Sequence, residues 1–143
     1  MANFQDGLHH KFLPLVWDLA RRMKALGIPM HLISGLRTWE QQKALYAQGR
    51  TKPGRRVTDA KPGYSYHNYG LAADWGRVDG KPLSEADWQV FGQEVKRLRN
   101  ESGALLVWGG TFPKLHDVGH VELHLAGKSI SQMRKAALAK GKP

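Results

Sequence analysis

The chain has 143 residues, the size of one ordinary domain, and its 41% hydrophobic and 9% aromatic residues are typical of a folded globular protein. It contains no cysteine, which excludes thiol nucleophiles, disulfides and thiolate metal sites, so His, Asp or Glu must hold any transition metal. The net charge of +10 favours an anionic partner, but the basic residues are spread thinly along the chain and match no motif that reads nucleic acid.

The N-terminal third predicts a helix, a short strand and a second helix. Apolar residues recur with helical spacing over residues 8–26. Residues 30–34 alternate between apolar and polar as in a strand. Thr38 and Gln41 have the spacing of a capping box, so a second helix is expected over residues 39–48.

The rest of the chain predicts a long loop followed by further strands and helices. The loop covers residues 50–66, which are basic, contain glycine and proline, and show no periodicity. A third helix is expected after Ser84, which Asp87 follows at capping-box spacing. The other expected elements are strands at 70–75, 105–108 and 120–125, and a helix at 130–139.

No repeat or linker divides the chain, so we expect one α+β catalytic domain over residues 1–143 with a frayed tail at 140–143 and no second binding domain. Residues 1–10 are polar and lack the apolar region of a signal peptide. No segment approaches the roughly 20 apolar residues of a membrane span. We therefore expect the chain to be made in the cytoplasm.

Two segments hold residues suited to metal chemistry. In residues 65–74, His67 ends the loop and Asp74 follows seven positions later, near the end of a short strand. In residues 117–124, Asp117 precedes His120 by three positions, and His124 lies on the same face of the expected strand. Three protein ligands and one water make a catalytic zinc site, although each of these residues alone also fits an ordinary surface or core position.

These segments resemble those of the peptidoglycan-cutting zinc peptidases of the LAS type, in particular the L-alanyl-D-glutamate endopeptidases found as phage endolysins. The S-x-H-x-x-G-x-A-x-D motif of that family falls on residues 65–74, and its carboxylate-x-x-His motif falls on Asp117 and His120. An earlier signature matches at Ser34–Thr38, Gln41, Leu45–Tyr46 and Gly49–Thr51. The resemblance covers roughly residues 8 to 125.

The resemblance implies one Zn²⁺ ion held by His67, Asp74 and His120. His124 is a competing ligand because it shares the strand face of His120, but the carboxylate-x-x-His match favours His120. It implies that Asp117 is the general base, which takes a proton from the attacking water and later delivers it to the departing amine. The expected fold is an antiparallel sheet with flanking helices, as in hedgehog and DD-peptidase domains.

Four more residues have expected roles, Arg37 and Ser65 from the resemblance and Tyr66 and Glu122 from their positions near the motifs. Arg37 is expected to grip a substrate carboxylate or to support the oxyanion, with a helix-capping or ion-pairing role as the alternative. Ser65 is expected to shape the loop or to hydrogen-bond a ligand or the substrate, and Tyr66 to line the cleft. Glu122 could orient a ligand or form an ordinary strand contact.

The expected function is hydrolysis of the L-alanyl-D-glutamate bond in a peptidoglycan stem peptide by a monomeric phage-type endolysin, which leaves the host cytoplasm to reach the wall. Nucleic acid is not the expected partner. Three alternatives remain. The chain could be a D,D-carboxypeptidase or D-Ala-D-Ala dipeptidase of the same fold, a zinc-binding wall-recognition module without activity, or a basic protein that binds an anionic polymer. Family members usually have an aromatic residue where Val121 stands and a proline in place of Gly119, so a wall of the cleft is expected to be missing.

Overall fold

The computed structural model describes residues 3–114 and 116–141. Within these residues the chain forms helices and strands in the order α1 (Leu13–Ala25), β1 (Met30–Ser34), α2 (Trp39–Ala47), η1 (Tyr66–Tyr69), β2 (Ala72–Arg77), α3 (Glu85–Ser102), β3 (Leu105–Trp108), η2 (Gly109–Thr111), β4 (His120–His124) and α4 (Ile130–Ala139), where η marks a short 3-10 helix. None of the helices in this part of the chain is both long and apolar enough to cross a membrane.

The expected elements are confirmed, with shifts at two of their starts. The first helix begins at Leu13 instead of residue 8, because Phe12 is its N-cap and the preceding residues form turns. β2 begins at Ala72 instead of residue 70, because Gly70 adopts a left-handed conformation (φ +68°) and closes η1. A frayed tail was expected over residues 140–143. Lys140 is the C-cap of α4, and residues 142–143 lie outside the described residues.

The four strands form one antiparallel sheet in the order β1-β2-β4-β3. Helices α1 and α3 cover one of its faces, and their apolar side chains share a core with alternate strand residues. The strand residues in this core include Leu32, Ala73, Trp75, Val121 and Leu123. Because side chains alternate along a strand, the intervening residues of β2 and β4 point to the opposite face of the sheet.

That opposite face carries the polar residues of the two central strands. Asp74 of β2 lies directly across from His120 of β4, and Ala72 lies across from Glu122. His124, two residues further along β4, shares the same face. The sheet therefore separates an apolar layer from a polar layer that contains most of the predicted ligands.

A β-bulge in the edge strand β1 brings one more polar residue to this face. The register with β2 pairs Leu32 with Trp75 and then Ser34 with Asp74, so Ile33 is an extra residue without a partner. Leu32 packs in the core, whereas Ser34 hydrogen-bonds to the Asp74 carboxylate. The bulge thus turns Ser34 toward the polar layer, as bulges near functional sites commonly do.

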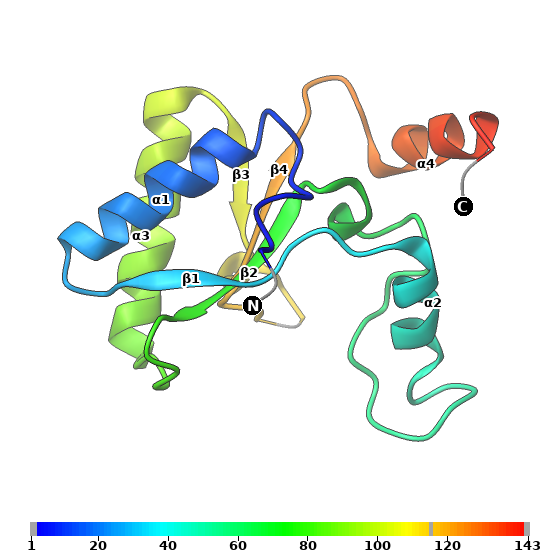
Figure 1. Cartoon of the computed structure of the whole chain (residues 1–143), viewed down its shortest axis with the longest axis horizontal. Helices are drawn as coiled ribbons and strands as arrows, with labels where there is room; N and C mark the ends of the chain where they lie inside the picture. Colours follow the sequence, from blue (N-terminus) through cyan, green and yellow to red (C-terminus); the bar gives the residue numbers. More distant parts are fainter. Residues whose placement is uncertain (1–2, 115, 142–143) are drawn as a thin grey trace.

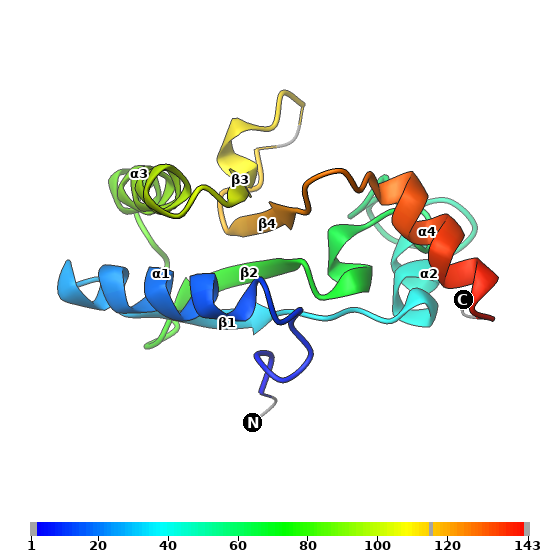
Figure 2. The same cartoon turned by 90° about the horizontal axis from the view of Figure 1, so that it is seen from above.

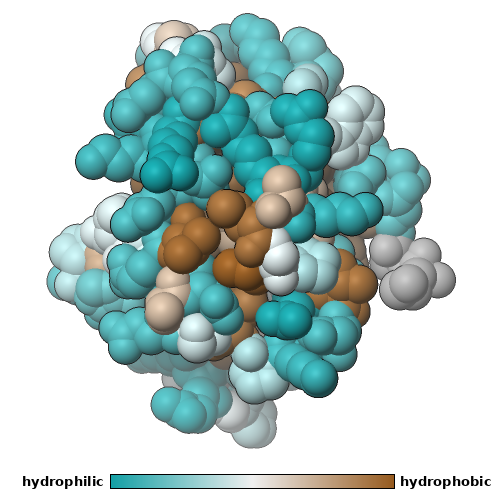
Figure 3. Space-filling model, turned by 90° about the vertical axis from the view of Figure 1, so that its left-hand side faces the viewer, coloured by the Kyte–Doolittle hydropathy of each residue, from teal (hydrophilic) through white to brown (hydrophobic). Residues whose placement is uncertain are grey.

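The elements fall into two groups at opposite ends of the molecule (Figures 1 and 2). Helices α1 and α3 lie at one end with most of the sheet, and α2 and α4 lie at the other with the long loop before η1. Figure 3 shows that the end opposite α2 and α4 has a small hydrophobic patch surrounded by hydrophilic side chains. The polar layer of the sheet lies between the two groups.

Candidate metal centre

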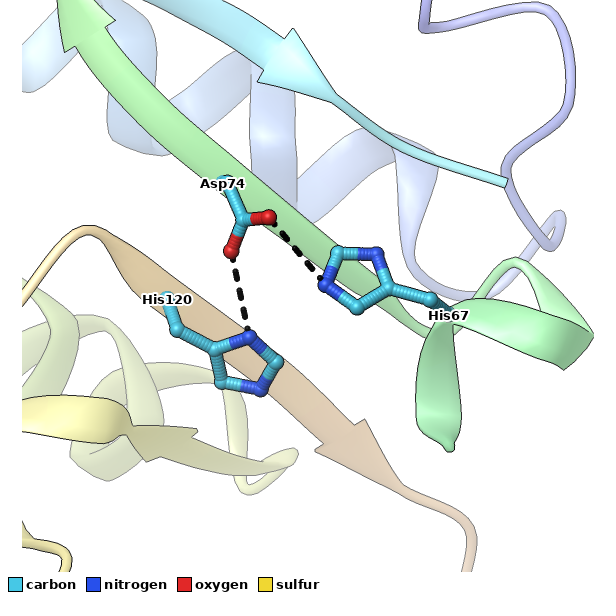
Figure 4. A group of neighbouring side chains, drawn as sticks. All are labelled: His67, Asp74 and His120. Atoms are coloured by element: carbon cyan, nitrogen blue, oxygen red, sulfur yellow. Dashed lines mark hydrogen bonds and ion pairs between the residues drawn. The ribbon is translucent and has the colours of Figure 1, made fainter. Parts of the chain in front are cut away.

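His67, Asp74 and His120 converge from three separate elements (Figure 4). One ligand atom from each residue lies within 4.8 Å of the other two. The Asp74 carboxylate is central, with Oδ2 3.3 Å from His67 Nε2 and Oδ1 3.2 Å from His120 Nδ1. His67 and His120 are buried, and Asp74 is partly buried.

Hydrogen bonds determine which nitrogen of each imidazole faces the cluster. His67 Nδ1 lies 2.8 Å from the carbonyl oxygen of Gly35, which can only accept, so this nitrogen carries the proton and Nε2 has the free lone pair. His120 Nε2 lies 2.7 Å from Glu122 Oε1, which leaves Nδ1 toward Asp74. Both rings therefore present a lone pair to the same point once His120 is neutral.

The charges at the centre shift the pKa values of its residues in opposite directions. Burial would raise the pKa of Asp74, but the contacts of its carboxylate with His120, His67 and Ser34 hold it far below its usual range. Burial alone would lower the pKa of His120, whereas hydrogen bonds to Asp74 and Glu122 raise it to about 9. Asp74 is therefore an anion at any physiological pH.

Glu122 links His120 to His124 on the same face of β4. Its second oxygen, Oε2, lies 2.5 Å from His124 Nε2, and the His124 ring stacks at 4.5 Å on Tyr66. Burial would raise the pKa of Glu122, but hydrogen bonds from His120 and His124 lower it. His124, the competing ligand in the sequence, thus contacts the far side of Glu122 and stands outside the three-residue cluster.

The donor set suits a zinc ion. Two imidazoles and one carboxylate leave room for a fourth ligand, which is the arrangement of catalytic rather than structural zinc sites. Zinc-to-ligand distances of about 2.0–2.1 Å in a tetrahedron place neighbouring ligand atoms about 3.3–3.5 Å apart. The distances from Asp74 to the two histidines are 3.3 and 3.2 Å. Metal ligation itself stays a prediction for these residues.

Asp117 stands at the edge of the cluster, in the turn that leads into β4. The backbone N–H of His120 donates to the carbonyl of Asp117, and the N–H of Asp117 donates to the carbonyl of Gly109. A Cβ atom on Gly109 would lie 2.1 Å from the Asp117 carbonyl oxygen, so only glycine allows this approach. Desolvation, followed by repulsion from Asp74, raises the pKa of the Asp117 carboxyl, against the attraction of His120, His67 and Arg37.

Arg37 lies close enough to the site for its charge to act on both acids. Burial lowers the pKa of its guanidinium, while Asp74 and Asp117 oppose this effect. Nη1 donates to Oε1 of Gln42, a fully buried residue of α2 that in turn donates to the carbonyl of Ala60. Gln42 therefore fixes Arg37 and the long loop together. Among the roles expected for Arg37, helix capping is excluded, because Thr38 caps α2.

Ser65 and Tyr66 line a cleft of about 300 Å³ that also contains Asp117, His120 and Glu122. The Ser65 hydroxyl accepts from the backbone N–H of His67 and caps η1, so it shapes the loop that presents this ligand. The expected role of Tyr66 in lining the cleft agrees with this placement. Its pKa is raised by burial and by the charge of Glu122.

The expectation of a missing cleft wall at Val121 is wrong. Val121 is 1% exposed and packs in the core, because the residue after His120 points to the other face of the sheet. The aromatic walls of the cleft come instead from Tyr66 and from Phe112, whose ring lies 5.6 Å from that of His120. The side chain at position 121 therefore belongs to the core.

Comparison with known proteins shows the family to which the chain belongs. A family model described as VanY, D-alanyl-D-alanine carboxypeptidase, matches residues 5–108. The peptidoglycan L-alanyl-D-glutamate endopeptidase CwlK of Bacillus subtilis (strain 168) is 35% identical over 126 residues, covering 77% of this chain and 72% of CwlK. The chain belongs to the VanY family. Membership confirms the family resemblance and the predicted enzyme class, a hydrolase of peptide bonds.

Solved structures show the same fold at lower sequence identity. The L-Ala D-Glu endopeptidase ChiX of Serratia marcescens has a TM-score of 0.61 at 22% identity, covering 85% of this chain and 84% of ChiX. A vancomycin resistance D,D-pentapeptidase VanY mutant in complex with Zn(II) has a TM-score of 0.61 at 16% identity, covering 90% and 78%. These likenesses confirm the expected α+β architecture.

The matched region of the VanY model includes His67 and Asp74 but ends before Asp117 and His120. The placement of these last two residues therefore rests on the geometry of β4 and of the turn before it. Sequence reasoning missed Gln42 and Gly109, which position Arg37 and Asp117. It quoted Ser34 within a signature without its contact to Asp74. The capping box of Thr38 and Gln41, next to Gln42, was visible as a local signal, but a capping box does not indicate a contact across the fold.

Proposed function

We propose that the chain is a zinc-dependent endopeptidase that hydrolyses the bond between L-alanine and D-glutamate in the stem peptide of peptidoglycan. The observation that carries the proposal is the convergence of His67, Asp74 and His120 with one lone-pair atom each toward a common point. The choice of bond is supported by the 35% identity to CwlK, whose name gives this specificity. ChiX, with the same fold, is also named for it.

In this proposal His67, Asp74 and His120 hold one Zn²⁺ ion. An ion held there would polarise the scissile carbonyl and lower the pKa of the attacking water. Asp117 accepts the proton of that water and later delivers it to the departing amine. Its raised pKa suits both tasks, because a carboxyl of higher pKa is the stronger base and can also return the proton.

Arg37 is the second cationic group in this proposal. Its guanidinium feels the charges of both Asp74 and Asp117, and Gln42 holds one of its amino groups in place. A fixed guanidinium binds a carboxylate of the stem peptide or the oxygen on which negative charge develops. Glu122 and Gly35 keep the two imidazoles in the orientation that the ligand set needs.

A second candidate is a D,D-carboxypeptidase, because the matching family model is described by that activity. The two candidates give different products from the same substrate. Cleavage between L-alanine and D-glutamate yields a peptide with N-terminal glutamate, whereas a D,D-carboxypeptidase releases free D-alanine. Mass analysis of the fragments from purified muropeptides decides between them.

The proposal requires that activity depends on the metal. We expect the purified enzyme to contain about one zinc per chain, to lose activity with a chelator and to recover it with zinc. The substitution His67→Ala should abolish metal binding. A metal-free wild-type chain that still releases peptides with N-terminal glutamate would contradict the proposal.

We further propose that the enzyme acts as a phage-type endolysin that is made in the host cytoplasm as a monomer. The motif resemblance to phage endolysins supports this role. Cells that express the chain should then lyse only after their cytoplasmic membrane is permeabilised, and an Asp117→Asn variant should not lyse them. Lysis without permeabilisation would contradict this part of the proposal.

A further inference from the structure

The positive charge of the chain is concentrated in two stretches, residues 37–66 and 125–141. We call these stretches together the basic lobe. They contain eleven of the 22 Lys and Arg residues but only two of the 12 Asp and Glu residues, Glu40 and Asp59. The basic lobe therefore has a net charge of +9, whereas the whole chain has +10. Half of the Lys and Arg residues lie outside the lobe, but so do ten of the 12 Asp and Glu residues, and this uneven placement of the acids concentrates the net charge in the lobe.

The two stretches of the basic lobe contact each other. The Arg134 guanidinium of α4 lies 4.7 Å from the centre of the Tyr64 ring and 5.9 Å from that of Trp39. Its Nε also donates to the carbonyl of Pro62. Figures 1 and 2 place α2 and α4 together at one end of the molecule, apart from α1 and α3. Like charges from distant sequence positions therefore gather at this end.

Most of the positive charges in the basic lobe are not neutralised by acids. Among the described residues, the one ion pair of a lobe cation is Arg50 with Asp59. Outside the lobe, by contrast, Arg21, Arg22, Arg77 and Arg97 all pair with carboxylates. The exposed lobe cations are Lys43, Lys52, Arg55, Arg56, Lys61, Lys128, Lys135 and Lys140. Such a surface has a positive potential that attracts polyanions.

The basic lobe borders the candidate active site. Residues 57–60 and Tyr64 of the lobe line the same cleft as Asp117 and His120. Arg50 holds this part of the loop in place by donating to the carbonyls of Tyr46 and Thr58. A polymer that lies on the lobe can therefore extend into the cleft without a change in the fold.

We propose that the basic lobe binds the carboxylates of peptidoglycan itself, so that the catalytic domain contains its own surface for holding the wall. This inference rests on the proposed function, because the polymer on the lobe is the one whose stem peptides enter the cleft. Stem peptides carry free carboxylates along every strand, and each contact with an exposed cation is weak and screened over about 10 Å at 0.1 M salt. Many such contacts together retain the enzyme on the insoluble polymer while individual stems exchange in the cleft.

The test compares two triple variants with the same change in net charge. Lys52→Gln, Arg55→Gln and Lys135→Gln remove three exposed cations from the lobe, whereas Lys24→Gln, Lys81→Gln and Lys96→Gln remove three exposed cations elsewhere. Binding is measured by co-sedimentation with peptidoglycan sacculi freed of attached polymers, in an Asp117→Asn background that prevents digestion. Turnover of a soluble muropeptide is measured with Asp117 intact.

We expect the lobe variant to bind sacculi roughly tenfold more weakly at low salt, the control variant to change less than about twofold, and high salt to remove the difference. Equal weakening by both variants, or none, would overturn the inference. The inference would also be overturned if the lobe cations strengthened binding only to sacculi that still carry phosphate polymers. The same holds if they strengthened binding to nucleic acid but not to bare sacculi. If the proposed function is wrong, no variant releases fragments from the muropeptide. If only this inference is wrong, fragments are released, but binding to sacculi does not depend on the lobe cations.

Discussion

Replacement of Glu122 by glutamine tests the geometry of the candidate metal centre without changing any of its three proposed ligands. Glu122 accepts from His120 Nε2 at 2.7 Å and from His124 Nε2 at 2.5 Å. Glutamine keeps the shape and one acceptor oxygen but loses the charge, and hydrogen bonds to a charged partner are about twice as strong as neutral ones. Loss of a partner that orients a metal-binding histidine typically costs 10- to 100-fold in metal affinity. We expect about tenfold for Glu122→Gln, or about 1.4 kcal/mol, and about 100-fold for Glu122→Ala.

The assay is competition for zinc between the protein and a chromogenic chelator, with circular dichroism to show that the fold is retained. His124→Ala is the matched control, because it removes the outer hydrogen bond of Glu122 and leaves the bond to His120. We expect the control to lose less than about threefold in affinity. Unchanged affinity in Glu122→Gln and Glu122→Ala, with the fold intact, would refute the claim that this carboxylate orients His120.

Three further predictions concern the base, the turn before β4 and the pH dependence of metal binding. Asp117→Asn should keep zinc but lower kcat by about 10²- to 10⁴-fold, and a fully active variant would show that another group is the base. Gly109→Ala should lose both activity and metal affinity, because its Cβ would lie 2.1 Å from the Asp117 carbonyl oxygen and 2.9 Å from His120 Cβ. Gly80→Ala strains a turn with a left-handed residue (φ +73°), but its Cβ meets no neighbouring atom, so this variant should keep both. The pKa of His120 is raised to about 9 without the metal, so the imidazole must lose a proton before it can bind zinc. The apparent zinc affinity should therefore fall by about tenfold for each pH unit below that value. Chelator competition across the pH range measures this slope, and an affinity that does not change with pH would contradict the prediction.

Local sequence signals predicted the helices and strands because their determinants are close together in the chain. The pairs Thr38–Gln41 and Ser84–Asp87 form capping boxes at the starts of α2 and α3, where they were expected. The start of α1 was placed too early, because Phe12 has the apolar spacing of a helix but its buried side chain lies at the N-cap. Periodicity reports burial, and a buried turn satisfies it as well as a helix does.

The candidate site was predictable only where its residues lie within one motif. Spacing marked His67 with Asp74, and Asp117 with His120, as candidates, and the family resemblance gave them their expected roles. The contact of Ser34 with Asp74 depends on a bulge in β1 and on the register with β2, neither of which is written in a local pattern. The same holds for the basic lobe, because the sequence places its two stretches about 60 residues apart and only the fold brings them together.

Consecutive residues of strand β4 belong alternately to the candidate metal centre and to the hydrophobic core. His120, Glu122 and His124 face the polar layer, while Val121 and Leu123 pack among the apolar side chains beneath α1 and α3. A slip of one position in its pairing would exchange the two sets and place imidazoles in hydrocarbon. The proposed metal centre and the correct packing of the domain therefore form together or not at all, so zinc uptake by the proposed centre would report whether the chain has reached its native register.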